Sequence, residues 1–172
     1  MEKIYLLDAS EVELEDYKNL RLESLREEPQ AFGSSYKDQK DLPNEDWQTW
    51  LDRYKEGKRN WMIFASNSQK LIGMMGAYQT DLDFENKEAN IIAVYVTKQS
   101  RGKGVSKILM KGLLDKLTNK TSIQKIKLSV NIDQIAAIKL YESFGFKVVE
   151  KDTVVLGDGK AHDEYLMQKN IK

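Results

Sequence analysis

A basic, glycine-containing turn is the part of the sequence with the clearest chemical potential. Gly102 and Gly104 alternate with Arg101 and Lys103, and Lys107 follows shortly after them. Glycine lets backbone N–H groups approach an anion because no Cβ stands in the way, and the nearby cations add positive charge. These residues favour the binding of a phosphate group, although a solvated turn whose lysines face water has the same composition.

The residues on either side of the turn predict the elements that position it. The run at 91–96 is almost wholly apolar and rich in β-branched residues, which predicts a buried strand. From Val105 to Leu117 the apolar residues recur with helical spacing, which predicts an amphipathic helix. A strand, a glycine turn and a helix in this order place the free N–H groups of a helix N-terminus, with their positive dipole, at the turn.

Two common phosphate-binding motifs are absent from this stretch. A P-loop requires the string G-x-x-x-x-G-K-[ST], which does not occur in the sequence. A dinucleotide-binding fingerprint requires G-x-G-x-x-G, and Lys107 stands where its third glycine belongs. The turn therefore does not predict a nucleoside triphosphate or a dinucleotide as its ligand.

A second stretch, at residues 128–146, combines a predicted strand with a helix that ends at a glycine. Asp133 is a typical N-cap residue, and Gly145 is a typical residue at a helix C-terminus. Ala137 and Tyr141 lie within the helix. Taken alone, this pattern describes an ordinary amphipathic helix.

Together the two stretches resemble the acetyl-CoA-binding segments of the GNAT N-acetyltransferase superfamily. The first is similar to the family pattern of a strand, (Gln/Arg)-x-x-Gly-x-(Gly/Ala) and a helix, with Ser106 in the last small-residue position. The second is similar to a strand followed by Asn-x-x-Ala-x-x-Leu-Tyr-x-x-x-Gly-Phe, with Gln134 in place of the asparagine. The resemblance covers about residues 60–168 and points to a small bacterial-type member.

The resemblance implies a cosubstrate and a set of site residues. Acetyl-CoA would bind at the glycine turn, and an acceptor amine would attack its thioester directly within a ternary complex. Backbone N–H groups of the strand before the turn would polarise the thioester carbonyl. Tyr141 matches the family's general acid, and an ordinary tyrosine pKa of roughly 10 keeps the hydroxyl protonated at neutral pH. The cofactor-binding residues implied in this way are Val94, Tyr95, Val96, Arg101, Gly102, Lys103, Gly104, Val105, Ser106, Lys107, Asn131, Gln134 and Ala137.

The general base is not supplied by the resemblance. The two positions at which family members carry a glutamate hold Asn90 and Ser129. Glu88 would share a strand face with Asn90 and is the candidate base, directly or through a water, although it is also a typical charge at a sheet edge. His162 is a second candidate because its unperturbed pKa lies near neutrality. An acceptor amine that arrives deprotonated would need neither residue.

Composition narrows the remaining function classes. The 172 residues, with 41% hydrophobic and 31% charged residues, suit one globular domain. The chain has no cysteine and one histidine, which excludes disulfides and thiolate ligands and argues against a metal site. The net charge of +0 argues against nucleic acid, and no apolar run reaches the length of a membrane span. We expect a cytoplasmic protein without a signal peptide.

The remaining pattern predicts an α/β fold of the α+β kind, in one domain over residues 1–172. Ser10 and Glu13 form a candidate capping box for a first helix, and a second helix is expected from Pro43 to Glu56. Residues 81–87 are expected to form a polar connection. The resemblance implies a central mixed, mostly antiparallel sheet of about seven strands flanked by about four helices. The strands are expected at 4–7, 61–65, 71–78, 91–96, 123–130, 146–149, 153–156 and 161–167.

The acceptor side is expected in the least family-like part of the chain. Residues 30–41 read as an irregular loop with two aromatic residues, Phe32 and Tyr36, beside a helix that carries Trp47. We expect an N-acetyltransferase that uses acetyl-CoA, without a metal, and that acts on a primary amine of a small molecule or protein. The alternatives are a CoA-binding module without turnover and a nucleotide- or nucleic-acid-binding α/β domain. The sequence leaves open the acceptor and the oligomeric state, a homodimer included.

Overall fold

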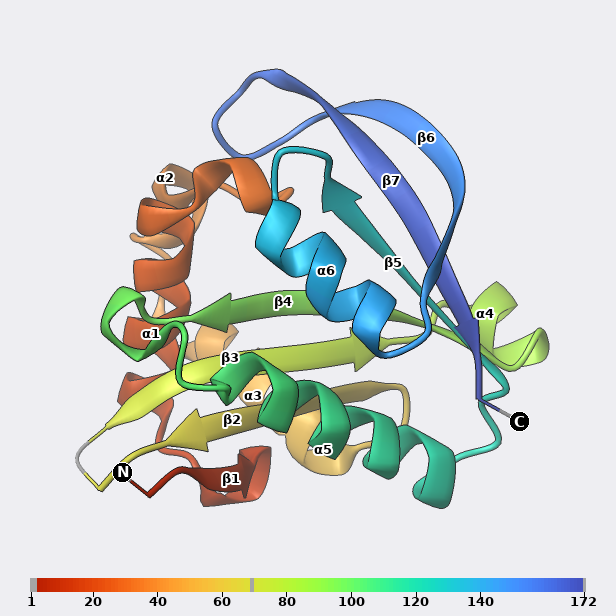
Figure 1. Cartoon of the computed structure of the whole chain (residues 1–172). Helices are drawn as coiled ribbons and strands as arrows, with labels where there is room; N and C mark the ends of the chain where they lie inside the picture. The colour runs from red at the N-terminus through yellow and green to blue at the C-terminus, as the bar shows by residue number, and fades with distance from the viewer. Residues whose placement is uncertain (1–2, 69, 172) are drawn as a thin grey trace.

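A mixed β-sheet of seven strands runs through the computed structural model, which describes residues 3–68 and 70–171 (Figure 1). The strands are β1 (Tyr5–Asp8), β2 (Asn60–Ser66), β3 (Leu71–Tyr78), β4 (Glu88–Val96), β5 (Lys125–Asn131), β6 (Lys147–Val155) and β7 (Ala161–Asn170). Their order is β1-β2-β3-β4-β5-β7-β6, and every neighbouring pair is antiparallel except β4 with β5. The expected mixed, mostly antiparallel sheet is thereby confirmed.

Helices cover both faces of this sheet (Figure 1). The α-helices of the described chain are α1 (Leu14–Glu27), α2 (Tyr36–Gln39), α3 (Asn44–Glu56), α4 (Asp81–Glu85), α5 (Val105–Lys120) and α6 (Ile135–Ser143). The number exceeds the four expected because two polar segments predicted as loops, α2 and α4, form short helices. Each has a side-chain N-cap that accepts a hydrogen bond from the first turn, Ser35 for α2 and Thr80 for α4.

Two predicted boundaries near the ends of the chain are wrong. Asp8 and Glu11, not Ser10 and Glu13, form the first capping box: the Asp8 N–H donates to Glu11 Oε2 at 2.8 Å, around a short 3-10 turn. The helix itself begins later, at Leu14. At the other end, the two extended segments predicted at 146–149 and 153–156 are one continuous strand, β6, because β7 pairs with its whole length.

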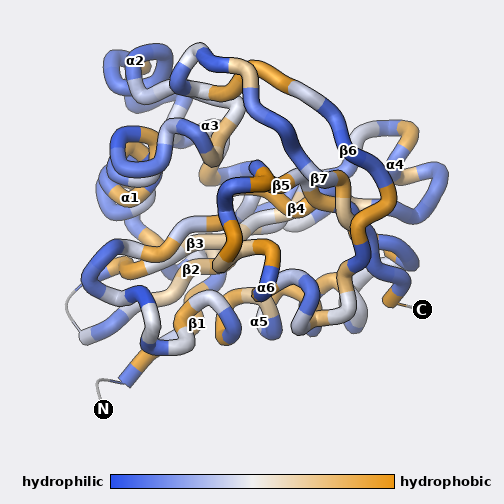
Figure 2. Tube along the Cα trace, turned by 45° about the horizontal axis from the view of Figure 1, so that its top comes forward, coloured by the Kyte–Doolittle hydropathy of each residue, from blue (hydrophilic) through white to orange (hydrophobic). Residues whose placement is uncertain are grey.

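The sheet separates two hydrophobic clusters because successive strand residues point to opposite faces. Ile63 of β2 packs on the face covered by α5 and α6, with Leu109 among its buried neighbours in that cluster. The adjacent residue, Phe64, packs on the face covered by α1 and α3, with Trp47 and Leu51. In Figure 2 the central strands carry much of the hydrophobic colour, whereas outer elements such as α2 are largely hydrophilic. No helix of the described residues is long and apolar enough to cross a membrane.

The parallel pair at the centre of the sheet is short. β4 and β5 pair only from Glu88 with Lys125 to Asn90 with Lys127, and beyond this point the two strands diverge (Figure 1). A polar cluster holds the paired end: Lys127 Nζ lies 2.9 Å from Asp83 Oδ1 and 2.7 Å from Glu88 Oε2, and Asn90 Nδ2 donates to Asp83 Oδ2 at 2.8 Å. The two strands are therefore held together at the end that contains Glu88 and are separated at the other end.

Candidate active site

The open part of β4 contains an irregularity. Ala93 has a φ of 55°, a left-handed conformation that few non-glycine residues adopt. The register with β3 shifts at the same place, so that β4 has one residue more than β3 between the flanking pairs. Because pairing with β5 ends at Asn90, peptide groups after this residue that face β5 have no partner strand there in the described chain. The irregularity lies just before Val94–Val96, whose N–H groups the resemblance assigned to the thioester carbonyl.

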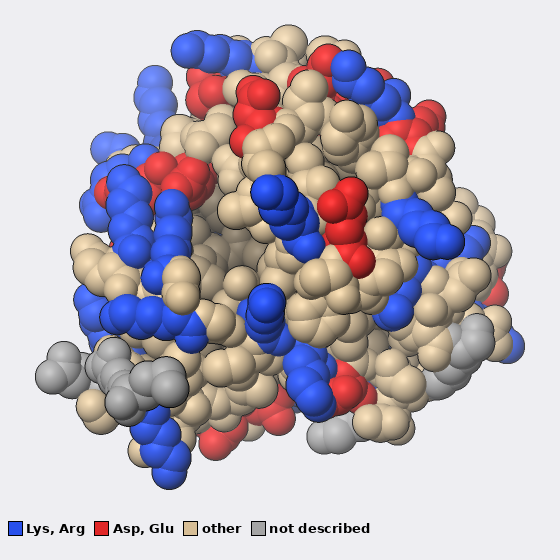
Figure 3. Space-filling model, in the orientation of Figure 1, with Lys and Arg blue, Asp and Glu red and all other residues tan. Residues whose placement is uncertain are grey.

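The glycine turn after β4 exposes its backbone. Gly102 and Gly104 have φ values of 74° and 81°, and a Cβ on either would have no other part of the described chain within 4 Å. Gly104 is the N-cap residue of α5, so the free N–H groups of that helix begin here. A space-filling view shows a hollow near this turn with lysine and arginine side chains around it (Figure 3).

A cavity of about 470 Å³ lies against the turn. Among the predicted cofactor-binding residues, those lining it are Val94, Tyr95, Val96, Arg101, Gly102, Gly104, Val105, Ser106, Lys107, Gln134 and Ala137. Lys103 does not line it, and Asn131 lines a second cleft instead. The residues of the two family-like stretches thus come together around one cavity, although they are separated by about thirty positions in the sequence.

Ion pairs and hydrogen bonds attach the wall of this cavity to the C-terminal end of α1. The Arg101 guanidinium lies 2.8 Å from Glu28 Oε1 and also donates to the Val96 carbonyl at 3.1 Å. Tyr95 donates its hydroxyl hydrogen to Glu23 at 2.9 Å. Because Glu28 pairs with Arg101, the positive charge of that arginine is partly neutralised at the turn, and Lys107 is the other cation of the cavity wall.

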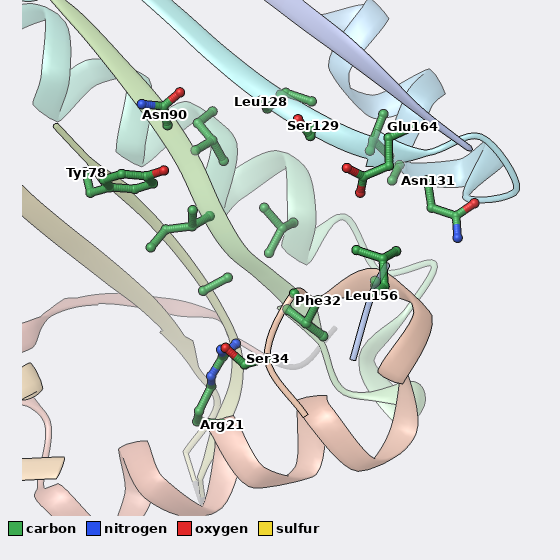
Figure 4. Close-up of a pocket in the computed structure, with 18 of the residues that line it drawn as sticks. Arg21, Phe32, Ser34, Tyr78, Asn90, Leu128, Ser129, Asn131, Leu156 and Glu164 are labelled. Carbon is green, nitrogen blue, oxygen red and sulfur yellow. The ribbon is translucent and has the colours of Figure 1, made fainter. Parts of the chain in front are cut away.

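A larger cleft of about 720 Å³ meets the first one (Figure 4). The two share Ala31, Val94, Gln134 and Ala137, so they join beside the irregular part of β4 and the start of α6. The tip of the β6–β7 hairpin closes one side, where the Gly157 N–H donates to the Phe32 carbonyl at 2.7 Å. The geometry therefore offers one continuous space with two arms and a junction at β4.

Tyr141 lies in the wall of the larger cleft. Its side chain is buried, and its ring packs edge-on against Phe146 with the ring centroids 6.1 Å apart. Among the described residues its hydroxyl has no hydrogen-bond partner, and burial raises the pKa of the phenol well above its usual value. A phenol in this environment keeps its proton and has it free to donate.

Asn131 and His162 tie three segments together. Asn131 Nδ2 lies 3.1 Å from both the Gln30 carbonyl and His162 Nδ1, and Asn131 Oδ1 accepts from the Asp133 N–H at 2.9 Å. His162 Nε2 lies 2.8 Å from Asp158 Oδ2. A neutral ring with its hydrogen on Nε2 satisfies both contacts of the histidine. His162 is partly buried and lines neither cavity, so its position does not suit the role of general base.

Glu88 also lies outside both cavities. Lys125 and Lys127 contact its carboxylate at 2.8 and 2.7 Å and lower its pKa. A carboxylate that forms ion pairs with two lysines, at the end of β4 that pairs with β5, is poorly placed to accept a proton from an acceptor amine. The geometry therefore does not support the role of general base that was expected for Glu88. Of the two aromatic residues expected on the acceptor side, Phe32 lines the larger cleft and Tyr36 packs against the α1–α3 cluster.

Three charged residues of the larger cleft, Glu164, Arg21 and Arg53, were not anticipated from the sequence. Glu164 of β7 directs its carboxylate into the cleft, and its pKa is raised by burial and by the nearby Asp152 (Figure 4). Arg21 of α1 lines the opposite side. A signal for Arg21 was available: it follows the buried Tyr17 by four residues and therefore shares the inward face of its helix. In the described part of the chain no three His, Asp or Glu residues gather as a metal site would need.

Comparison with known proteins identifies the family. The model of the acetyltransferase (GNAT) family matches residues 19–146, and the chain belongs to this family. A curated relative, an N-alpha-acetyltransferase of Saccharolobus solfataricus, is 28% identical over 85 residues, which are 49% of this chain and 50% of the relative. The match therefore spans about half of the length of that protein.

Solved structures share the fold over almost the whole chain. An acetyltransferase of the GNAT family from Streptococcus pneumoniae has a TM-score of 0.78 at 18% identity, covering 98% of this chain and 100% of its own. The yncA protein of Salmonella typhimurium, solved with its cofactor acetyl-CoA, has a TM-score of 0.80 at 16% identity, with coverages of 100% and 95%. Spermidine N-acetyltransferase from Vibrio cholerae, in complex with CoA and spermine, has a TM-score of 0.76 at 18% identity, with coverages of 97% and 95%.

Proposed function

We propose that this protein transfers an acetyl group from acetyl-CoA to a primary amine, which attacks the thioester directly within a ternary complex. The observation that carries the proposal is the junction of the two cavities at Val94, Gln134 and Ala137. The smaller cavity begins at a turn with exposed N–H groups and a lysine, which suits a pyrophosphate. The larger one has the volume of a small-molecule site. Both substrates can therefore meet at one point.

The residues of the smaller cavity would hold the cosubstrate. The backbone of Gly102 and Gly104 and the first turn of α5 fit a pyrophosphate because their N–H groups are free and no side chain covers them. Acetyl-CoA when bound supplies the acetyl group as an activated thioester. Free N–H groups of Val94–Val96 would lie along it, and the fixed irregularity at Ala93 sets their direction before the substrate arrives.

Two residues of the larger cleft are assigned to proton transfer. Tyr141 holds a proton at its hydroxyl oxygen and donates it to the leaving sulfur: its raised pKa keeps the hydroxyl protonated until the thiolate forms, and its lack of an internal partner leaves the hydrogen free for the sulfur. Glu164 takes over the role expected of Glu88, because it has no ion-pair partner within the described residues and directs its carboxylate into the cleft. A raised pKa brings this carboxylate closer to the range in which a general base works.

The test is a measurement of CoA thiol release with a panel of primary amines, with acetylated product identified by mass spectrometry. We expect at least one amine to increase thiol release well above the rate of acetyl-CoA hydrolysis alone. Binding of acetyl-CoA is measured separately by calorimetry. An acceptor-independent rate across the panel, in a protein that binds acetyl-CoA, would refute the proposed transfer.

A second candidate, a CoA-binding module without turnover, has one observation in its favour. The two positions at which family members carry a glutamate hold Asn90 and Ser129, and both line the larger cleft with uncharged side chains. This candidate predicts binding of acetyl-CoA together with no acetylated product from any amine. The same pair of measurements therefore distinguishes the two functions.

A further inference from the structure

Arg21 places a positive charge in the larger cleft without a partner. Its Nη1 atom is buried, and it has no hydrogen-bond partner in the part of the chain that the structure describes. The guanidinium carbon lies 5.1 Å from the centroid of the Phe32 ring, which offers an aromatic face and no acceptor oxygen. The other neighbours with a marked electrostatic effect are the phenols of Tyr17 and Tyr54. No carboxylate of residues 3–68 or 70–171 forms an ion pair with Arg21.

A guanidinium with a buried nitrogen that lacks a hydrogen-bond partner is unfavourable for the protein alone. Burying a charged group costs several kcal/mol unless it is paired and hydrogen-bonded, and buried arginines are normally paired for this reason. Arg21 is not isolated in this respect, since Gln39 Oε1 in the wall of the same cleft is also buried without a partner. Two polar groups without hydrogen-bond partners in one cleft indicate that a bound ligand provides those partners.

The charged residues of the cleft indicate which charges its ligand carries. Among the residues that the structure describes, the wall of the cleft contains the cations Arg21 and Arg53 and a single carboxylate, that of Glu164. Such a wall does not suit a polyamine, whose several ammonium groups would need several carboxylates. In Figure 4 Arg21 and Glu164 lie toward different ends of the cleft, with Phe32 and Leu156 between them. The arrangement fits a molecule with an anionic group at one end and an amine at the other.

We infer that the acceptor is a small amine that also carries a carboxylate, such as an amino acid or a short peptide, and that Arg21 binds this carboxylate. The inference rests on the proposed acetyl transfer in the same cleft. A planar guanidinium offers two parallel N–H donors that match the two oxygens of a carboxylate. With its carboxylate at Arg21, the ligand extends along the apolar surface of Phe32 and Leu156 and directs its amine toward Glu164.

The test compares matched ligands that differ only in the carboxylate. Dissociation constants are measured by calorimetry for the common L-amino acids and glycyl dipeptides, and for their carboxamides, with the protein saturated with CoA so that no turnover occurs. Hydrogen bonds to a charged group are worth about 1.5–3 kcal/mol, so we expect the best carboxylate ligand to bind roughly 10- to 150-fold more tightly than its carboxamide. Equal binding of the two forms, or no binding of any member, would overturn the inference.

Variants of α1 show whether Arg21 is the cause. In Arg21→Gln the preference for the carboxylate should disappear, with the carboxamide affinity and the affinity for CoA unchanged. Arg21→Lys should retain part of the preference, because lysine keeps the charge and loses the paired donors. Arg26→Gln is the matched control: Arg26 is on the same helix, is paired with Glu27 at 3.6 Å and lines neither cavity, so the preference should remain. A loss of both ligand forms to the same degree in Arg21→Gln would mean a structural role.

Failure of this inference can be told apart from failure of the proposed function. If amines without a carboxylate, such as spermidine, are acetylated with a kcat/KM as high as that of any amino acid, the carboxylate inference is refuted and acetyl transfer is upheld. If carboxylates bind with the expected preference but no member of the panel is acetylated, the ligand class is upheld and acetyl transfer is refuted.

Discussion

Replacing Tyr141 by phenylalanine removes one oxygen atom from the site and almost nothing from the fold. The ring stays buried against Phe146, and no hydrogen bond within the described chain is lost because the hydroxyl makes none there. The free energy of unfolding should therefore change by less than about 1 kcal/mol, which is the typical net value of a single hydrogen bond. A denaturant titration of both proteins checks that the variant is folded and equally stable.

The effect on catalysis should be much larger. A positioned general acid contributes about 10²–10⁴-fold, which corresponds to roughly 3–5.5 kcal/mol of activation free energy. We expect kcat for CoA thiol release to fall by this factor in Tyr141→Phe. The affinity for acetyl-CoA should change by much less, because Tyr141 lines the larger cleft and not the cosubstrate cavity.

The assay must separate chemistry from binding. Single-turnover measurements at saturating acetyl-CoA give the rate of the chemical step, and calorimetry gives the dissociation constant. A kcat within about threefold of the parent would refute the role of Tyr141, since a difference below about 0.7 kcal/mol does not require a lost acid. If kcat falls and the dissociation constant for acetyl-CoA rises by the same factor, the hydroxyl binds the cosubstrate and does not protonate the leaving group.

Three further predictions follow from the geometry. Gly104→Val puts a side chain into the cosubstrate cavity at a φ of 81° and should weaken acetyl-CoA binding at least about tenfold by calorimetry; Gly159→Val, at a φ of 75° in the β6–β7 turn, is the control and should leave the affinity unchanged. Activity should rise with pH through the raised pKa of Glu164, because a general base must be deprotonated to accept a proton. Glu164→Gln should lower kcat and abolish this rise of activity with pH. If the rise persists in the variant, another group is responsible for it. Burial opposes ionisation of Asp83, but hydrogen bonds from Thr80 and Lys127 outweigh this effect and hold its pKa at about 2. The free energy of unfolding, measured with urea, should therefore decrease as the pH falls from about 4 to 2. Asp83→Asn should weaken this dependence on pH.

The sequence predicted the elements that depend on local pattern. The apolar run before the turn, the helical spacing from Val105 and the glycine at 145 each specify a conformation through residues that are close in the chain, and the structure has a strand, a helix and a left-handed φ of 85° at those places. The short helices α2 and α4 were missed because their caps, Ser35 and Thr80, lie in polar segments without helical periodicity. A single turn of helix is too short to leave a periodic signal.

The cleft was less predictable because it is made by long-range contacts. Glu88 and Glu164 are both glutamates in strands of the sheet, and nothing local distinguishes the one paired with two lysines from the one that faces the cleft. The difference arises from strand order: β4 is paired with β5 at Glu88, whereas Glu164 of β7 lies between Asp152 of β6 and Asn131 of β5. The surroundings of each glutamate depend on which strands pair with its own, and the residues next to it in the sequence do not determine that pairing.

The extra residue in β4 determines to which face of the sheet each side chain points in the last part of this strand. Ile91 and Val94 are three positions apart, so in a regular strand they would point to opposite faces, yet both pack on the α5–α6 side. Tyr95 correspondingly points to the α1 side, where it reaches Glu23. Deleting one residue at Ala93 would exchange the two faces for everything up to the glycine turn, whereas substitutions there leave the alternation intact. The length of this strand is therefore under stricter constraint than its composition, and homologous enzymes should differ here by replacement and not by insertion or deletion.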